Sequence, residues 1–319
     1  MAPRSPLPQR HGLDAVRLYT PDDGPWTTMR DHLVARLPRV DPGRIDAMLA
    51  AGAIVGRHGP VDPLAPYRAR EFLWFHRDLP DEVPVPFAIP VLHRDDEVVV
   101  ADKPHFLATI PRGRHVVETA LVRLRRELDL PDLSPAHRLD RVTAGVLLFV
   151  VRRERRGAYQ TLFRDRRVHK TYEAVAPYDP ALALPRTVRS RIVKERGVIL
   201  AHEVPGPPNA ETLVELLEHD GERARYRLTP LTGRTHQLRL HMRGLGVPIL
   251  GDRFYGTPSG EPEDSALDDW TRPLQLLART LELPDPATGA TRRFTSRRTL
   301  QAFHDPAGWA TGPRISRSG

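Results

Sequence analysis

The sequence contains no cysteine, and this absence excludes several classes of function. Disulfide bridges, thiolate catalysis and zinc sites built from cysteine are ruled out. Long hydrophobic runs are also missing, since the longest apolar stretch, Val146 to Val151, is far too short to span a bilayer. Residues 1–14 carry prolines and arginines and lack the apolar stretch of a secretory signal. We therefore expect a soluble, cytoplasmic protein.

Lysine is scarce, although the chain is strongly basic. Of the 48 basic side chains, only Lys103, Lys170 and Lys194 are lysines, and the other 45 are arginines. Forty acidic residues leave a formal charge of +8. A GC-rich genome would explain the ratio of arginine to lysine, but not the positive excess. Because the arginine fork matches phosphate oxygens and stacks on bases, the charge favours RNA as a partner over an anionic membrane.

Composition divides the 319 residues into five parts. Residues 1–24 are rich in proline and are expected to form a flexible tail. Residues 25–80 form a small module, and the acidic, proline-rich residues 81–88 form a linker. Residues 89–305 are the main domain, and residues 306–319 form a C-terminal tail. Since 40% of the residues are hydrophobic, the chain can build a true core.

The small module is predicted to contain two helices followed by two short strands. Apolar residues recur at helical spacing over residues 29–37 and 45–52, and residues 53–56 and 71–75 fit short strands. This order resembles an S4-like RNA-binding module, whose I-x-x-x-L-x-x-G-x-V turn is matched by Ile45 to Val55. The alternative is a helical cap that packs on the main domain.

The main domain alternates strands with helices. Helices are expected at residues 119–128 and 154–166, and an irregular insertion or a hairpin at residues 178–210. The expected strands are residues 97–101, 146–151, 170–176, 212–217 and 224–228.

Asp140 is the residue that best fits a catalytic carboxylate. It ends the sequence HRLD at residues 137–140 and lies between Arg138 and Arg141. Nearby positive charge keeps an aspartate ionised, and an ionised carboxylate is equipped for nucleophilic attack. On this tetrapeptide alone, a structural aspartate in a turn or a surface ion pair is the alternative.

A second basic segment, GRTHQLRLH, occupies residues 233–241. Leu238 and Leu240 are expected on one face of a short periodic segment, with Arg239 on the other. His236 and His241 do not predict a metal site, because no third acidic or cysteine ligand stands at ligand spacing. Arg239 is better interpreted as the partner of a buried carboxylate or of a phosphate.

Four motifs occur in one order along the chain. They are H-R-L-D-x-x-T from His137, K-x-Y-x-A from Lys170, G-R-T-H-Q-L-R from Gly233 and G-x-P-I-x-G-D-x-x-Y-G from Gly246. Together they resemble the RluA-type RNA pseudouridine synthases over roughly residues 89–300. Two positions depart from the family pattern: Ala144 stands where serine is usual, and Phe106 stands where glycine is common. Neither is expected to be the nucleophile.

The resemblance implies an α+β fold, with a curved, mostly antiparallel mixed sheet, flanking helices and an active cleft across the middle. The implied reaction is the isomerisation of uridine to pseudouridine within RNA. Asp140 would be the catalytic aspartate, which either adds to the sugar or removes a sugar proton. Arg239 would pair with Asp140 and keep it ionised, and Tyr172 would lie against the uracil ring.

A second group of residues is expected to contact RNA. Arg138 would help to displace the target nucleotide, because a stacked base must be extruded before its glycosidic bond can be reached. The basic segment 152–170 would contact phosphates. The alternative interpretation is that its charges lie on a helix face exposed to solvent. The other residues assigned to RNA binding are Arg141, Thr143, Lys170, Arg234, His236 and Gln237.

Two other functions stay open at this point. One is an RNA-binding protein on the same fold that has lost catalysis. The other is a glycosidase-like hydrolase that releases uracil, although the sequence offers no second acid in a matching motif. The expected partner is 23S ribosomal RNA or transfer RNA, with no metal, cofactor or membrane, and the protein is expected to be a monomer.

Overall fold

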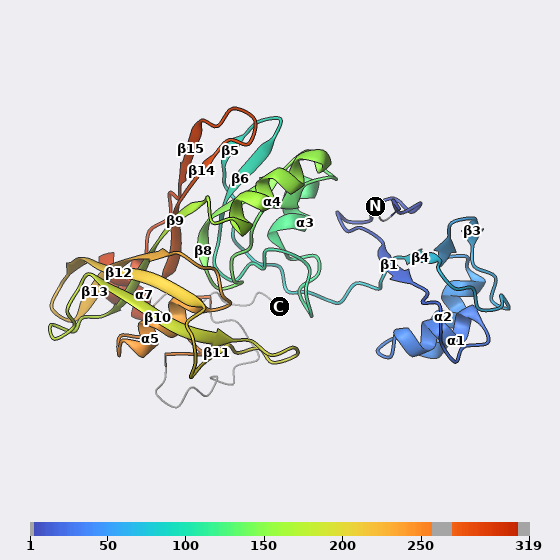
Figure 1. Ribbon diagram of the computed structural model, residues 1–319, viewed down its shortest axis with the longest axis horizontal. Helices are drawn as coiled ribbons and strands as arrows, with labels where there is room; N and C mark the ends of the chain where they lie inside the picture. The colour runs from blue at the N-terminus through green and yellow to red at the C-terminus, as the bar shows by residue number, and fades with distance from the viewer. Residues whose placement is uncertain (1–2, 257–269, 312–319) are drawn as a thin grey trace. The chain divides into compact units, whose positions relative to one another are not determined.

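The computed structural model describes residues 3–256 and 270–311. Residues 257–269 of the predicted main domain, and residues 1–2 and 312–319 of the predicted tails, lie outside this range. The chain divides into two compact units, Met1–Glu82 and Val83–Gly319 (Figure 1). Within the described residues, no helix combines the length and the apolar character needed to cross a membrane.

The first unit packs two helices on one antiparallel sheet. Thr28 begins the first helix with a capping box, in which its side chain accepts from the N–H of Asp31 and the Asp31 carboxylate accepts from the N–H of Thr28. Leu33, Ile45 and Leu73 lie in the core between helices and sheet. The elements are β1 (Val16–Tyr19), α1 (Met29–Arg36), α2 (Pro42–Ala50), β2 (Val55–Gly56), β3 (Gly59–Pro60) and β4 (Phe72–Phe75), with sheet order β1-β4-β2-β3.

The expectation of a flexible tail over residues 1–24 is wrong for Val16–Tyr19. This segment is strand β1, and it pairs along its whole length with β4, from Val16 opposite Phe75 to Tyr19 opposite Phe72. Four residues between prolines give too short an alternation to detect in the sequence. The strand is stabilised by partners that lie more than fifty residues away.

The second unit is built on an 11-stranded sheet with the order β11-β10-β12-β13-β9-β14-β8-β6-β5, to which β15 and β7 add at β14 and β8. The β14–β8 pair is parallel, and the other pairs are antiparallel. This confirms the predicted α+β class with a mostly antiparallel mixed sheet. The strands are β5 (Val91–Arg94), β6 (Val98–Lys103), β7 (Ser134–Pro135), β8 (Ala144–Val150), β9 (His169–Pro177), β10 (Arg186–Val193), β11 (His202–Val204), β12 (Ala210–His219), β13 (Arg223–Pro230), β14 (Leu276–Pro284) and β15 (Thr291–Thr295).

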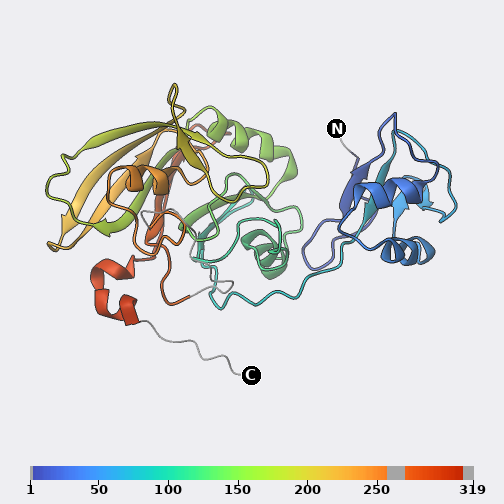
Figure 2. The same cartoon turned by 90° about the horizontal axis from the view of Figure 1, so that it is seen from below.

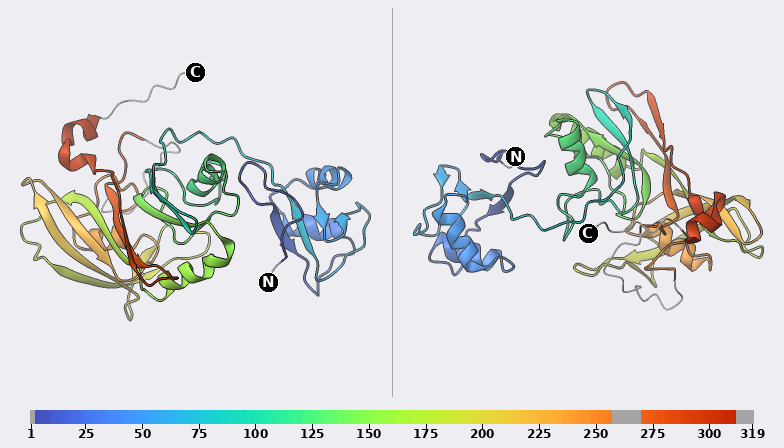
Figure 3. Two further views of the ribbon diagram at one scale, coloured as in Figure 1. Left: turned by 90° about the horizontal axis from the view of Figure 1, so that it is seen from above. Right: turned by 180° about the vertical axis from the view of Figure 1, so that it is seen from behind.

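Helices accompany this sheet and follow its last strand. The helical elements are α3 (Ala120–Glu127), η1 (Arg153–Arg155), α4 (Arg156–Arg164), α5 (Gln237–Gly244), α6 (Gln301–His304) and α7 (Pro306–Thr311). Helix α7 begins the segment predicted as a C-terminal tail, and Figure 2 shows α6 and α7 in red. In Figure 3 the red β14–β15 hairpin is visible, and β15 lies beside β5 through contacts between Phe294 and His93.

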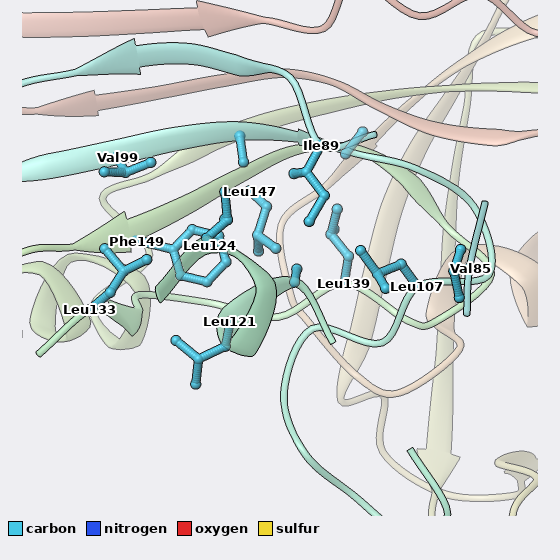
Figure 4. Close-up of a cluster of buried hydrophobic side chains, with 13 residues drawn as sticks. Val85, Ile89, Val99, Leu107, Leu121, Leu124, Leu133, Leu139, Leu147 and Phe149 are labelled. Carbon is cyan, nitrogen blue, oxygen red and sulfur yellow. The ribbon is translucent and has the colours of Figure 1, made fainter. Parts of the chain in front are cut away.

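Strands β6 and β8 are buried on both faces, which explains why their sequences are almost continuously apolar. One set of alternating residues packs with α3, and the other set packs with Tyr159 and Leu162 of α4. Leu139 belongs to the α3 cluster and lies near Leu107 and Leu147 (Figure 4). The residue directly before Asp140 is therefore anchored in the core.

Gly145 is required by the close approach of β8 to β14. Its φ is +114°, and a Cβ atom there would overlap the backbone of Ala278. Only glycine combines this backbone angle with the missing side chain. Glycine at this point in the segment that follows Asp140 therefore allows the parallel β14–β8 pair to form beside the Asp140 loop.

We expect Gly145→Ala to lower the free energy of unfolding by about 1–3 kcal/mol from backbone strain, with the overlap adding to this. Gly157→Ala is the matched control, because Gly157 lies in α4 and a Cβ atom there would meet nothing within 4 Å. That control should gain about 0.5–1 kcal/mol. Urea denaturation followed by circular dichroism compares the two variants, and equal stability would contradict the argument.

Candidate functional site

Asp140 lies in the loop between β7 and β8, with a half-exposed side chain. The loop turns where the N–H of Thr143 donates to the Asp140 carbonyl at 3.1 Å. The Asp140 carboxylate is 35% exposed, and its Oδ2 lies 4.0 Å from His236 Nε2. Among the described residues, no hydrogen bond is made to this carboxylate. It is therefore positioned by its backbone and open to a substrate.

Buried side chains fix that backbone. The amine of Lys103 donates to the carbonyls of Pro104, Leu107 and Arg141 at 2.9, 2.8 and 3.1 Å. The Thr109 hydroxyl donates to the Leu139 carbonyl at 2.8 Å and accepts from the Leu139 N–H at 3.2 Å. The residues on both sides of Asp140 are thus held by hydrogen bonds to the preceding segment.

Two histidines complete this support, and both are neutral. His105 Nδ1 donates to the Val142 carbonyl at 2.7 Å, and burial lowers its pKa to about 4. His137 Nε2 accepts from the N–H of Leu148 at 3.1 Å, and burial lowers its pKa to about 3. A protonated His137 could not accept this bond, so neutrality is part of the loop's structure.

Segment 233–241 brings its residues to Asp140 through a helix. Residues 237–244 form α5, so the predicted alternation of Leu238 and Leu240 against Arg239 is wrong, and all three side chains are buried. His236 stands just before the helix with a left-handed φ of 56°. Burial lowers the pKa of His236, while the charge of Asp140 opposes this shift.

Arg239 does not pair directly with Asp140. Its Nε and Nη2 donate to Asp252 at 2.7 and 2.6 Å, and both side chains are buried. This corrects the pairing that the resemblance implied and agrees with the interpretation of Arg239 as the partner of a buried carboxylate. Burial alone would lower the pKa of Arg239, but Asp252, with a smaller contribution from Asp140, raises it. Asp140 therefore experiences the charge of Arg239 without contacting it.

Asp252 also organises the turn that follows it. Its Oδ1 accepts the N–H groups of Phe254 and Tyr255, each at 3.0 Å. The Tyr255 hydroxyl meets His236 Nδ1 at 2.8 Å. A continuous chain of contacts thus runs from Arg239 through Asp252 and Tyr255 to His236, beside Asp140.

Tyr172 and Lys170 reach the site from β9. Tyr172 is partly buried and packs against the hydrophobic clusters of both halves of the sheet. Burial, and then the charge of Asp140, raises the pKa of its hydroxyl, so the phenol stays protonated at neutral pH. The Lys170 amine lies next to Gly233, where a Cβ atom would be 3.9 Å from it, and burial followed by Arg166 lowers its pKa.

The residues expected to contact RNA fall into different environments. Arg138 is exposed, and within the described part of the chain its guanidinium has no hydrogen bond or ion pair. Arg234 is exposed, with Nε donating to the Asn209 carbonyl at 3.1 Å. Arg141 donates to the Phe106 carbonyl at 3.3 Å, and Thr143 is buried. Of these, Arg138 and Arg234 are the most accessible.

Gln237 is a structural residue, contrary to expectation. It is 3% exposed. Its Oε1 accepts from Thr232 and from the N–H of Arg234, and its Nε2 donates to Glu211 and Thr212. No hydrogen-bonding capacity is left for RNA, and the residue holds the loop before α5 in place.

The basic segment 152–170 is less available than its sequence indicates. Four of its arginines pair with carboxylates of the same unit: Arg152 with Asp96, Arg155 with Glu97, Arg156 with Asp132 and Arg164 with Asp165. Within the described residues, the guanidinium groups of Arg153, Arg166 and Arg167 make no such pairs. These three, with Lys170, are the members of the segment that remain open to phosphate.

Lys103, Asp252 and Tyr255 were not predicted as site residues, although Asp252 and Tyr255 lie in the motif that begins at Gly246. The pattern shows that these residue types recur in a family-like order. It does not show that a lysine folds inward onto carbonyls, or that the arginine of one motif binds the aspartate of the next. Both facts depend on burial.

We expect Asp252→Asn to lower the free energy of unfolding by about 3–5 kcal/mol, because the Arg239 charge would stay buried without its partner. Asp165→Asn is the control, since the Arg164–Asp165 pair is 73% and 43% exposed and such pairs contribute less than about 1 kcal/mol. Chemical denaturation measures both. A loss in Asp252→Asn no larger than in the control would contradict a stabilising buried pair.

Comparisons with known proteins agree with this geometry. Residues 97–243 match the family model described as RNA pseudouridylate synthase. The chain is 32% identical over 216 residues to the dual-specificity RNA pseudouridine synthase RluA of Escherichia coli K12, an alignment that covers 64% of this chain and 90% of that protein. It is 33% identical over 230 residues to human pseudouridylate synthase RPUSD2, covering 68% of this chain but 40% of the human protein.

A solved structure shows the same fold. Human RNA pseudouridylate synthase domain containing 4 aligns with a TM-score of 0.52 and 27% identity, over 66% of this chain and 88% of that one.

Proposed function

Since the chain belongs to the RNA pseudouridylate synthase family, we propose that it isomerises selected uridines of RNA to pseudouridine, with Asp140 as the catalytic carboxylate. The observation that carries the assignment is the half-exposed Asp140 carboxylate, held by its backbone beside Tyr172, His236 and Arg239. An ionised, accessible carboxylate is what the reaction requires.

The reaction exchanges one bond to C1′ for another. The N1–C1′ bond breaks, the uracil turns, and a C5–C1′ bond forms. The proton that leaves C5 is balanced by the one that N1 gains, so the product is an isomer and no redox partner is needed. Asp140 acts at the sugar, either by adding to it or by removing a proton from it.

Tyr172 and Arg239 have supporting roles in this proposal. Tyr172 lies against the uracil ring, and its protonated hydroxyl is a hydrogen-bond donor near Asp140. Arg239 stabilises the negative charge of Asp140 through space, while its fork is occupied by Asp252. The buried Arg239–Asp252 pair is thus a fixed source of electrostatic field in the site.

RNA is bound by the second unit. Residues 1–82 hold 11 arginines and 11 carboxylates, so the excess charge of +8 lies entirely in residues 83–319. Phosphate contacts from Arg153, Arg166, Arg167 and Lys170 offset the cost of unstacking the target base, about a few kcal/mol. Arg138 assists the displacement of that base, and the exposed Arg234 contacts the RNA, whereas Arg141 and the buried Thr143 hold the loop that carries Asp140.

The proposed substrate is 23S ribosomal RNA or transfer RNA. The similarity to the dual-specificity enzyme RluA, of which 90% is covered, supports this choice. Carbodiimide-based mapping of pseudouridine in total RNA, with and without the protein, identifies the modified position. A single site that is lost with the protein would name the RNA.

We expect Asp140→Asn to abolish pseudouridine formation at the mapped site while RNA binding changes less than about threefold, because one exposed carboxylate contributes little to binding a polyanion. Asp129→Asn, an exposed aspartate with a φ of 52° that asparagine also tolerates, is the control and should keep full activity. Single-turnover assays and filter binding measure the two effects.

Three results would overturn the proposal. Full activity of Asp140→Asn would remove Asp140 from catalysis. Release of free uracil would show a hydrolase, and RNA binding without any product would show a protein that has lost catalysis.

We also propose that the first unit is an S4-like second contact with RNA. Its balanced charge means that such contact depends on individual arginines. Arg36 and Arg39 are exposed, and among the described residues their guanidinium groups make no hydrogen bond or ion pair. Two other arginines at the helices, Arg30 and Arg44, are paired with Asp46 and Asp78.

The double substitution of Arg36 and Arg39 by alanine should weaken RNA binding and reduce the slope of log affinity against log salt by about 1–2, since each lost phosphate contact removes about one released counterion. The paired substitution of the exposed Arg57 and Arg68 is the control in the same unit. An unchanged salt slope in the first variant would exclude phosphate contacts by these arginines.

A further inference from the structure

His236 is held in one orientation by a saturated hydroxyl. The Tyr255 oxygen meets three groups: the Ala201 N–H at 2.9 Å, the Ala201 carbonyl at 2.9 Å and His236 Nδ1 at 2.8 Å. A phenol has one proton to donate and two lone pairs to accept with. Each of these three contacts therefore has a defined direction.

The direction follows from the carbonyl of Ala201, which can only accept. If Tyr255 donates to this carbonyl, its oxygen accepts from the Ala201 N–H and from His236 Nδ1–H, and every group is satisfied. If Tyr255 instead donated to Nδ1, the buried Ala201 carbonyl would lose its partner, at a cost of about 1–3 kcal/mol. The proton of His236 therefore resides on Nδ1, and Nε2 carries a lone pair.

That lone pair lies beside the Asp140 carboxylate. Nε2 and Oδ2 are 4.0 Å apart, which is too long for a direct hydrogen bond. The groups whose charge acts on His236 are Asp140, Arg239, Asp252 and Lys194, and burial has the largest effect, leaving its pKa below the usual value. At neutral pH the site thus presents two acceptors side by side, one anionic and one neutral.

The geometry points to His236 as the acceptor of the 2′-hydroxyl hydrogen of the target ribose, with Tyr255 as the residue that positions it. This inference rests on the proposed function. The contact makes the site selective for ribose over deoxyribose. A uridine within an RNA chain offers two hydrogen-bond donors, the 2′-hydroxyl and N3–H. The 2′-oxygen is bonded to C2′, the direct neighbour of C1′, whereas N3 lies across the base.

Asp140 must act at C1′ or at C2′–H, so its near neighbour Nε2 faces the sugar and not the far edge of the base. The 2′-hydroxyl is also the group that distinguishes RNA from DNA. A site with a fixed acceptor rejects a sugar that cannot donate, because the acceptor is then left without a partner.

The test combines an enzyme variant with a change of substrate. The probe is a synthetic stem-loop RNA containing the mapped uridine, made with uridine or with 2′-deoxy-2′-fluorouridine at the target. In His236→Asn the shorter amide places no acceptor at the position of Nε2, and asparagine tolerates the left-handed backbone at this position. Any intrinsic effect of fluorine on bond cleavage is the same for both enzymes and cancels in the comparison.

We expect His236→Asn to slow single-turnover isomerisation of the natural RNA by about tenfold or more, and to change the rate on the fluorinated RNA by less than about twofold. The rate of Tyr255→Phe on the natural RNA should lie between those of the unaltered protein and of His236→Asn, because Nδ1 loses its fixed partner. His236→Gln, whose longer side chain brings its amide oxygen near the position of Nε2, should recover part of the discrimination. If the fluorinated RNA is not converted by either enzyme, the dissociation constants of the two RNAs are compared for the unaltered protein and for His236→Asn.

Equal losses on both RNAs would overturn the inference, since His236 would then act independently of the 2′-hydroxyl. If His236→Asn instead lost discrimination against an RNA with 3-methyluridine at the target, Nε2 would be assigned to N3–H. That result would also overturn the inference. The failure of the proposed function is distinguishable, because no pseudouridine would then be formed by the unaltered protein at any mapped site.

Discussion

The buried ion pair between Arg239 and Asp252 is the interaction on which the rest of the site depends. Two charges removed from water are tolerable only when their geometry is good and their remaining groups are satisfied. Both conditions hold here, because the arginine fork is engaged twice and Oδ1 of Asp252 also accepts two backbone N–H groups. The pair fixes α5 to the turn that carries Tyr255, and Tyr255 in turn fixes His236.

Asp140 is positioned differently: within the part of the chain that the structure describes, hydrogen bonds hold the backbone on both sides of it, and none is made to its carboxylate. The three carbonyls around the Lys103 amine match the three N–H donors of an ammonium group. Burial lowers the pKa of Lys103, and the charge of Asp140 opposes that shift. The lysine therefore shapes the loop on which Asp140 lies.

The sequence predicted the parts of this site that depend on local pattern. Strand β8 and helix α3 followed from apolar runs and helical spacing, and the motif order identified the family. Three features were missed because they depend on distant partners. They are the pairing of β1 with β4, the burial of Gln237, and the ion pair of Arg239 with Asp252 in place of Asp140. A motif gives the residue type, but the partner of a side chain is decided by packing.

The distribution of the carboxylates also argues for an isomerase over a hydrolase. Glycoside hydrolysis commonly uses two carboxyl groups, one of which must exchange protons with the leaving group or with water. Asp252 is the other acid beside Asp140 whose charge acts on His236, yet it is buried and bound to Arg239 and to two N–H groups. A carboxylate held in this way cannot deliver or take a proton without breaking the structure. Of the two acids that act on His236 among the described residues, Asp140 is left as the accessible one, which suits a reaction that retains the base and does not need water as a reactant.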